Sequence, residues 1–382
     1  MTLPKNKEIC SILPGKTIGI IGGGQLGRMM ALSAKYMGYN IAVLDPTPNC
    51  PTAQVADHHI VTSYDDMAGI KELTEMSDVV TYEFENVDLQ AATYIEQQRK
   101  LPQGAYALKI TQDREQEKTL LDQLNVPVAP FHIVTDEKST EHALNELDYP
   151  VVIKTTRGGY DGKGQLKIDS VAQRDEAITF VQENSPCIAE QWITFDREVS
   201  VVLTRTLAGE IECFPIAENE HRDHILYKTT VPANISETVE KQALDIAKKI
   251  AHGMEVVGTF AIEMFVAGEN IYVNEMAPRP HNSGHYTIEA CSIDQFAQHV
   301  RAICHLPLAP IKLLQNAQMI NVLGEHLEPL LTIMPTLGAP YVHLYGKAEA
   351  KEKRKMGHVT FVHEQKKDLR QLTTDFEERI NQ

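Results

Sequence analysis

The first apolar segments of the chain follow the order strand, helix, strand. An apolar run at 16–21 ends in three glycines, apolar residues with helical spacing follow over 26–37, and a second apolar run at 41–44 ends at Asp45. A strand, a glycine-rich turn, a helix and a second strand form one βαβ unit. The chain is therefore expected to begin with a domain built on a parallel sheet, which a later apolar run at 78–82 would extend.

The middle of the chain predicts a helix and a β-hairpin. Ser236 is a suitable N-cap, and the apolar residues that follow it over 237–251 recur at helical spacing. Two β-rich runs, 259–266 and 270–274, flank Gly268 and predict a hairpin. A βαβ unit combined with separate helices and hairpins is typical of a protein with both α/β and α+β parts.

Composition narrows the class of protein. The 382 residues suggest two or three domains, and an apolar fraction of 43% suffices for packed cores. No apolar run is long enough to span a bilayer, and the start of the chain lacks the features of a secretion signal. The six cysteines have neither metal-ligand nor redox spacing, so reduced thiols in the cytoplasm are expected.

The net charge of −16 bears on the partner. An acidic chain repels the phosphate backbone of nucleic acids, whose binding depends on cationic side chains. We therefore expect neither a nucleic acid nor a membrane as a partner. A small phosphorylated ligand is still compatible, because it needs only a local group of cations and backbone amides.

The first glycine loop, Gly22 to Gly27, satisfies the dinucleotide pattern G-x-G-x-x-G. It follows a predicted strand and opens a predicted helix, and Asp45 closes the next strand about twenty residues later. A nicotinamide dehydrogenase is therefore a competing hypothesis. The pattern is weak by itself, because many βαβ units use glycine there only for close packing.

The second glycine loop lies within 154–165 and has the parts that a nucleoside triphosphate needs. It is not a Walker A loop, because Lys163 is followed by Gly164. Its four glycines allow backbone amides to face phosphate oxygens, and Lys154 and Lys163 can neutralise phosphate charge. The alternative is a surface loop with solvated charges, which this density of glycine and lysine disfavours.

The predicted hairpin around Gly268 carries two carboxylates. A loop of odd length centred on Glu269 would place Glu263 directly opposite Glu275 on the same face. Two opposed carboxylates repel unless a cation joins them, and carboxylates with substrate phosphates are the usual ligands of Mg²⁺. The alternative is a glutamate that faces solvent on an edge strand, but Glu263 lies within a largely apolar run.

A polar, proline-rich loop follows this pair and contains Arg279. The planar guanidinium of arginine binds two oxygens of a carboxylate or a phosphate at once. A structural salt bridge is the simpler explanation for an isolated arginine. Its closeness in sequence to Glu275 favours a role at the site.

Several motifs together carry a resemblance to a known family. The order of Lys154, the second glycine loop, Glu263 and Glu275 resembles the ATP-grasp superfamily. More narrowly, the chain is similar to the family of 5-(carboxyamino)imidazole ribonucleotide synthetases over nearly its whole length. The motifs specific to that family lie at 22–29, 81–86, 157–165, 277–285, 345–347 and 354–358.

The resemblance implies an ATP-grasp fold in four parts. A Rossmann-like pre-ATP-grasp domain over 1–110, with an extension at 1–13, would precede a lid region over 111–190, an ATP-grasp body over 191–308 and a small β-rich domain over 309–382. ATP would lie between the lid and the body. The resemblance also implies a homodimer.

The resemblance assigns the site residues. The ATP-binding residues would be Arg114, Lys154, Gly159, Tyr160, Asp161, Gly162, Lys163, Gly164, Gln165, Glu190, Gln191, Trp192, Ile193, Glu198, His221, Asn274 and Glu275. The phosphoribosyl substrate would lie against Gln25, Leu26, Glu83, Tyr160, Asp161, His281, Asn282, Lys347 and Arg354. The ligands of Mg²⁺, or of Mn²⁺, would be Glu263, Asn274 and Glu275.

The implied activity is a carboxylation in de novo purine biosynthesis. ATP and bicarbonate would give carboxyphosphate and ADP, and the amine of 5-aminoimidazole ribonucleotide would capture the carboxyl group. Arg279 would hold the bicarbonate, Lys163 would neutralise charge on the transferred phosphoryl group, and Asp161 would orient the amine or take its proton.

Three other functions stay open at this point. A formate-dependent glycinamide ribonucleotide transformylase has the same architecture, although Asn282 and the motif at 355–358 argue against it. A dehydrogenase is supported only by the first glycine loop and Asp45. A non-catalytic nucleotide-binding protein is disfavoured by the intact carboxylates and Arg279.

Overall fold

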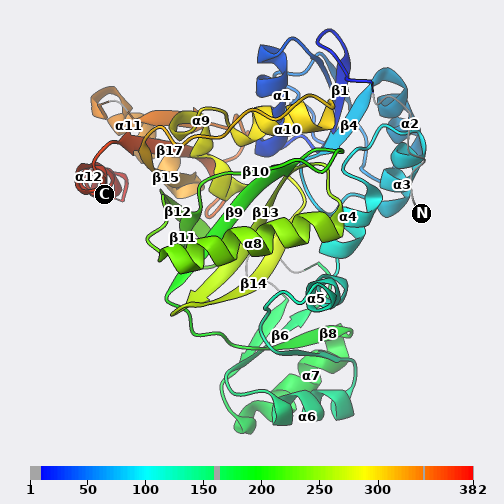
Figure 1. Cartoon of the computed structure of the whole chain (residues 1–382), viewed down its shortest axis with the longest axis vertical. Helices are drawn as coiled ribbons and strands as arrows, with labels where there is room; N and C mark the ends of the chain where they lie inside the picture. Colours follow the sequence, from blue (N-terminus) through cyan, green and yellow to red (C-terminus); the bar gives the residue numbers. More distant parts are fainter. Residues whose placement is uncertain (1–9, 159–163, 339, 382) are drawn as a thin grey trace.

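The computed structural model describes residues 10–158, 164–338 and 340–381. Within these residues the strands form three sheets of four, nine and four strands. Figure 1 shows the first sheet at the upper right, the large sheet across the centre and left, and the third sheet in a lobe below. The predicted division of the chain at 111, 191 and 309 stays a prediction.

The N-terminal part contains the predicted parallel sheet, in the order β3-β2-β1-β4. Its strands are almost fully buried, and the helices cover them with apolar side chains. The βαβ prediction is therefore confirmed. The elements are β1 (Thr17–Ile21), α1 (Gln25–Tyr36), β2 (Asn40–Leu44), β3 (His58–Ile60), α2 (Met67–Met76), β4 (Val79–Tyr82), α3 (Leu89–Gln97) and α4 (Ala105–Thr111).

The lower lobe, which we call the lid, is an antiparallel sheet in the order β5-β8-β6-β7, backed by two helices. Helix α5 precedes the lid in sequence, but its apolar side chains belong to the core of the large sheet. The elements are α5 (Arg114–Gln123), β5 (Phe131–Val134), α6 (Glu137–Glu146), β6 (Val151–Thr155), β7 (Gln165–Ile168), η1 (Val171–Gln173), α7 (Arg174–Asn184) and β8 (Cys187–Gln191).

The large sheet, which we call the body, runs β14-β13-β9-β11-β12-β15-β17-β16, with β10 paired to β9. The last three strands come from the C-terminal part of the chain, so that part extends the body sheet and does not form a separate sheet. The first elements are β9 (Arg197–Arg205), β10 (Ile211–Cys213), β11 (Ala217–Arg222), β12 (Ile225–Val231), α8 (Glu237–Met254), β13 (Gly258–Ala267), β14 (Asn270–Ala277) and η2 (Asn282–Gly284). The remaining elements are α9 (Thr287–Ala290), α10 (Gln295–Ile303), β15 (Asn316–Leu323), η3 (Gly324–His326), α11 (Leu327–Ile333), η4 (Met334–Thr336), β16 (Tyr341–Leu344), β17 (Lys355–His363) and α12 (Lys366–Ile380).

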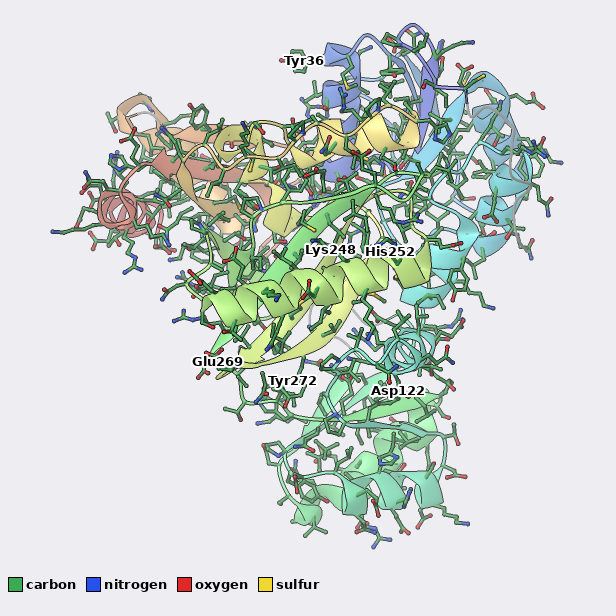
Figure 2. All side chains as sticks on the ribbon, viewed as in Figure 1. Tyr36, Asp122, Lys248, His252, Glu269 and Tyr272 are labelled. Atoms are coloured by element: carbon green, nitrogen blue, oxygen red, sulfur yellow. The ribbon has the colours of Figure 1, made fainter. Side chains whose placement is uncertain are left out.

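Helix α8 confirms the predicted cap and apolar face. The Ser236 side chain accepts a hydrogen bond from the Val239 amide, and the helix packs its apolar side against the body sheet. Lys248 and His252 lie on the opposite, exposed side (Figure 2). The helix ends at Met254 because the next residue adopts a left-handed conformation.

The hairpin of β13 and β14 pairs Glu263 with Glu275, as predicted. The predicted odd-length loop is wrong, because Ala267 pairs with Asn270 across a two-residue turn, with Glu269 at its tip (Figure 2). A β-bulge between Glu263 and Met264 then shifts the register by one residue. The bulge therefore brings the two carboxylates opposite each other.

Two further observations concern the chain as a whole. All six cysteines are free thiols. No helix in the part of the chain that the structure describes has both the length and the apolar character needed to cross a membrane.

Candidate active site

A cavity of about 1000 Å³ lies between the lid and the body. Lid strands β6 and β8 contribute one wall, and body strands β9, β11, β13 and β14 contribute the other. Most of the residues predicted to bind ATP or metal line it. They are Arg114, Lys154, Gly164, Gln165, Glu190, Gln191, Trp192, Ile193, Glu198, His221, Glu263, Asn274 and Glu275, and they are joined by Arg279, His281 and Asn282.

The Glu190 carboxylate is buried between two lysines. Its oxygens lie 3.1 Å from Lys118 Nζ and 2.5 Å from Lys154 Nζ. Burial alone would raise the pKa of Glu190, but the positive charges of Lys118 and Lys154 hold it well below its ordinary value. Glu190 was predicted to reach adenine. That role stays a prediction; in this structure its side chain contacts Lys154 and Lys118, of which Lys118 was not predicted.

Aromatic side chains form part of the cavity wall. Phe195 and Phe265 stack face to face with their ring centroids 4.5 Å apart. Trp192, at the end of the lid sheet, lies under the Lys167 ammonium, 4.9 Å from its ring centroid. Phe195 and Phe265 were not predicted, because an isolated aromatic residue in a sequence most often belongs to a core.

Glu198 and His221 form a hydrogen-bonded pair on neighbouring strands of the body. Burial lowers the pKa of His221, but the hydrogen bond with Glu198 and the charges of Glu263 and Glu198 outweigh burial and raise it. The pair therefore presents a charged, polar edge to the cavity, as expected for residues that bind polar groups of a nucleotide.

The predicted metal-binding carboxylates lie together. Burial raises the pKa of Glu263 to about 7, and repulsion from Glu275 adds to the rise. Arg114 lies 3.6 Å from Glu275, and His281 lies 3.5 Å from Glu263. No cluster of three or more His, Cys, Asp or Glu side chains suited to a metal occurs among the described residues. The two carboxylates still fit a cation that takes its other ligands from a bound phosphate, because their mutual repulsion would then be relieved.

Arg279 is buried beside Glu85. Its Nε donates to Glu85 Oε2 at 2.7 Å. Burial alone would raise the pKa of Glu85, but the charge of Arg279 and this hydrogen bond hold it below its ordinary value. Both residues line the cavity. Glu85 belongs to the motif at 81–86, but the sequence alone did not indicate its partner.

The first glycine loop is filled by side chains of the chain itself. Glu83 accepts hydrogen bonds from the amides of Gly24 and Gly27, and Asp45 Oδ2 accepts one from the Gly23 amide at 2.7 Å. A pyrophosphate at this helix N-terminus would meet these two carboxylates instead of free amides. The dehydrogenase hypothesis is therefore wrong, because Asp45 and Glu83 already accept the hydrogen bonds of the glycine amides that a dinucleotide would need.

Several residues predicted to bind the ribonucleotide lie outside the cavity lining. Lys347 Nζ donates to the carbonyl of Lys355, which does line the cavity and was not predicted. Arg354 is exposed and donates to the Glu349 carbonyl at 3.0 Å. Leu26 is buried in the N-terminal core.

The other predicted ribonucleotide residues have mixed positions. Asn282 lines the cavity, and its amide exchanges two hydrogen bonds with Asn321, at 3.0 and 2.6 Å. Gln25 begins helix α1. The predicted residues Gly159, Tyr160, Asp161, Gly162 and Lys163 lie outside the described residues.

Three family models match successive parts of the chain. The ribonucleotide synthetase preATP-grasp domain matches residues 15–112, and the ATP-grasp domain matches residues 119–296. The phosphoribosylaminoimidazole carboxylase C-terminal domain matches residues 317–372.

Several proteins are similar to this chain over nearly its whole length. The N5-carboxyaminoimidazole ribonucleotide synthase of Bacillus subtilis is 46% identical over 352 residues, which are 92% of each chain. A solved N5-carboxyaminoimidazole ribonucleotide synthetase with ADP is 51% identical, with a TM-score of 0.93 over 96% of this chain and 97% of the other. The enzyme of Aspergillus clavatus, solved with ADP and 5-aminoimidazole ribonucleotide, is 29% identical, with a TM-score of 0.89 over 96% of this chain and 98% of the other.

Proposed function

Because the chain belongs to the family of N5-carboxyaminoimidazole ribonucleotide synthases, we propose that the cavity between its lid and body carboxylates 5-aminoimidazole ribonucleotide at the expense of ATP. The chain is an ATP-grasp ligase. The observation that carries the proposal is the joint presence in one cavity of Lys154, the pair Glu263 and Glu275, and Arg279. In a phosphoryl transfer, Lys154 can bind the phosphates, the two glutamates can bind a metal, and Arg279 can bind the bicarbonate.

The nucleotide would lie with its phosphates toward Lys154 and Arg114. Lys154 is only 16% exposed and faces the cavity, so its charge acts in a medium that screens it weakly. The stacked pair Phe195 and Phe265 provides an apolar wall for a base. Glu198 and His221 provide a polar edge for hydroxyl groups.

We propose Mg²⁺ as the metal, with Mn²⁺ as a substitute. Glu263 and Glu275 would hold it, and it would offset the charge of the phosphates. Asn274 lines the cavity beside them. The chain's own part is to keep two carboxylates opposed on one face, which the bulge at Asn274 in β14 achieves.

Bicarbonate would bind beside Arg279, whose guanidinium stays charged in its buried position against Glu85. A bicarbonate oxygen attacks the γ-phosphorus, the bond to ADP breaks, and carboxyphosphate forms. The amine nitrogen of the ribonucleotide then bonds to the carboxyl carbon, the carbon–oxygen bond to phosphate breaks, and the nitrogen loses one proton. Asp161, which lies outside the described residues, is the proposed acceptor of that proton.

Water must be kept from carboxyphosphate, since it would hydrolyse in an open site. The position of the cavity between the lid and the body suits this requirement. His281, which lies beside Glu263, and Asn282 would face the ribonucleotide. Lys347 and Arg354 are proposed for its phosphate.

One assay tests the proposal. ADP release is measured with bicarbonate and 5-aminoimidazole ribonucleotide, and in parallel with formate and glycinamide ribonucleotide. We expect release only with the first pair. Release only with the second pair would contradict the proposal and support the transformylase, which the comparisons disfavour.

The homodimer and the cytoplasmic location that the resemblance implies stay predictions. Light scattering on the purified chain measures the first. A mass of twice the 42.7 kDa of the chain would support a dimer.

A further inference from the structure

Lys118 is a buried lysine that joins the lid to the body. Its side chain is 2% exposed, and its Nζ donates to the carbonyls of Val273 and Asn274 on β14, at 3.3 and 3.0 Å. On the other side it lies 3.1 Å from Glu190 Oε1 on lid strand β8. This last contact is an ion pair without hydrogen-bond alignment, because Glu190 Oε1 accepts no hydrogen bond from the described residues.

Helix α5, which carries Lys118, contacts β14 through two more side chains on the same face. Arg114 lies 3.6 Å from Glu275 Oε2, and Glu117 accepts a hydrogen bond of 2.7 Å from the Met276 amide. Residues three and four positions apart share one face of a helix. Together the three side chains contact four consecutive residues of β14, so the helix fixes the segment that carries Glu275.

The same helix is tied to the lid. The Arg114 amide donates to the Thr156 carbonyl, just after β6, at 2.9 Å. Figure 1 shows α5 where the lower lobe meets the body sheet. Helix α5 is therefore placed to set the distance between the lid wall and the body wall of the cavity.

Glu190 completes the connection to the nucleotide site. One of its oxygens faces Lys118 and the other faces Lys154, whose ammonium lines the cavity. One buried cation and one partly buried cation share one buried carboxylate, so the position of each group depends on the other two. Lys118 is not part of a surface ion pair, since neither it nor Glu190 nor Lys154 is exposed.

We propose that Lys118 is a positioning residue for nucleotide binding. It holds Glu190, and through it the Lys154 ammonium, at a fixed distance from the end of β14 that carries Glu275. Phosphate oxygens would then meet a cation from the lid and a carboxylate-bound metal from the body at the spacing they require. This inference rests on the proposed function only in taking the ligand to be an adenine nucleotide.

ADP affinity without metal tests the inference, measured by calorimetry in the presence of a chelator. We expect Lys118→Gln to bind ADP at least fivefold more weakly than the wild type. In a Glu190→Gln background the same substitution should change the affinity less than twofold, because Lys118 acts through Glu190. With Mg²⁺ present, the ADP concentration that gives half-maximal binding should also be higher for Lys118→Gln than for the wild type.

A matched control is Lys100→Gln. Lys100 also donates to a backbone carbonyl, that of Thr74 at 2.7 Å, but it lies in the N-terminal part. It should bind ADP like the wild type even where its melting temperature falls. Equal losses of affinity in Lys100→Gln and Lys118→Gln would contradict the proposal.

Two other results would overturn it. One is a Lys118→Gln variant with wild-type ADP affinity and only a lower melting temperature, which is the mark of a purely structural lysine. The other is an equal loss in the wild-type and Glu190→Gln backgrounds. No acceptor or bicarbonate enters these measurements, so a wrong assignment of the reaction would leave their outcome unchanged.

Lys118→Arg covers the case in which Lys118→Gln does not fold. It keeps the buried charge, but the planar guanidinium cannot occupy the point between two carbonyls and a carboxylate that the ammonium occupies. We expect a loss of ADP affinity of threefold or more. Wild-type affinity in a folded Lys118→Arg would contradict the proposal.

Discussion

At the scale of single residues, the cavity is a set of buried charges that balance one another. Glu190 lies between two lysines, and Arg279 lies against Glu85. Glu263 and Glu275 are the exception, because two carboxylates face each other there. The repulsion between these two carboxylates is the reason to expect a cation at that point.

Glu275→Gln should lower turnover by about two orders of magnitude or more, since it removes one charged ligand at the transferring phosphoryl group. The fold should survive, because Glu275 is partly exposed and its nearest cation is 3.6 Å away. Turnover and circular dichroism measure the two effects. Glu269→Gln, at the tip of the same hairpin, is the control and should keep full activity (Figure 2). Near-normal turnover of Glu275→Gln at ordinary Mg²⁺ would refute the metal assignment.

The ionisation of Lys347 should make both stability and phosphate binding depend on pH. Burial, with the positive charge of Arg354, lowers its pKa to about 8 from 10.5. The native state therefore releases this proton before the unfolded state does, so the contribution of Lys347 to stability rises between about pH 8 and 10.5. Binding of a phosphate to Lys347 requires the charged form and weakens over the same range.

Steady-state kinetics measures the effect on binding. The KM for the ribonucleotide should rise above pH 8, while the KM for ATP changes little. Lys347→Arg should flatten the rise, because arginine stays charged. A KM for the ribonucleotide that is the same at pH 7 and pH 9 in the wild type would exclude this role of Lys347.

At the scale of elements, the first turn of helix α1 is packed too tightly for any side chain at Gly27. An added Cβ would lie 2.5 Å from Thr52 Oγ1 and 2.8 Å from the Gly22 carbonyl oxygen. Gly27→Ala should therefore destabilise the protein by about 1–3 kcal/mol. Urea unfolding followed by circular dichroism measures the loss.

The same variant separates packing from nucleotide binding. Once folded, Gly27→Ala should bind ADP like the wild type, since ADP would lie between lid and body. A selective loss of ADP affinity with unchanged stability would mean that the first glycine loop binds the nucleotide after all.

Local patterns predicted those elements that local forces determine. The βαβ unit, the Ser236 cap and the pairing of Glu263 with Glu275 were confirmed. The turn that produces the pairing was predicted wrongly, because the pairing depends on one extra residue in β14, Asn274, which the spacing of the residues alone does not reveal.

Side-chain partners distant in sequence were beyond prediction from the residues. Lys154 and Glu190 are 36 positions apart, and Glu85 and Arg279 are 194 positions apart. The sequence shows each charge but not which opposite charge the fold brings to it. Lys118 was missed for this reason, since an isolated lysine on a polar helix is most often solvated.

At the scale of the whole molecule, strands from the C-terminal part complete the sheet that carries the site. Strand β15 pairs with β12 of the body, and β17 brings Lys355 to the cavity. The N-terminal part closes its own glycine loop with Glu83 and Asp45. One cavity therefore receives side chains from the lid, the body and the C-terminal strands.

Hydrogen exchange maps where the nucleotide binds. ADP should slow exchange at the amides of β8 and β14, and leave those of β1 and α1 unchanged, because only the first pair lines the cavity. Mass spectrometry of peptides from both regions measures this. Protection confined to β1 and α1 would place the nucleotide at the first glycine loop.

The most direct test of the central claim follows an oxygen atom. Bicarbonate labelled with ¹⁸O is turned over with ATP and 5-aminoimidazole ribonucleotide, and the phosphate is analysed by mass spectrometry. If bicarbonate attacks the γ-phosphorus in this cavity, each phosphate released carries one labelled oxygen, and each ADP is matched by one carboxylated ribonucleotide. Unlabelled phosphate would show that water is the attacking group and would contradict the account.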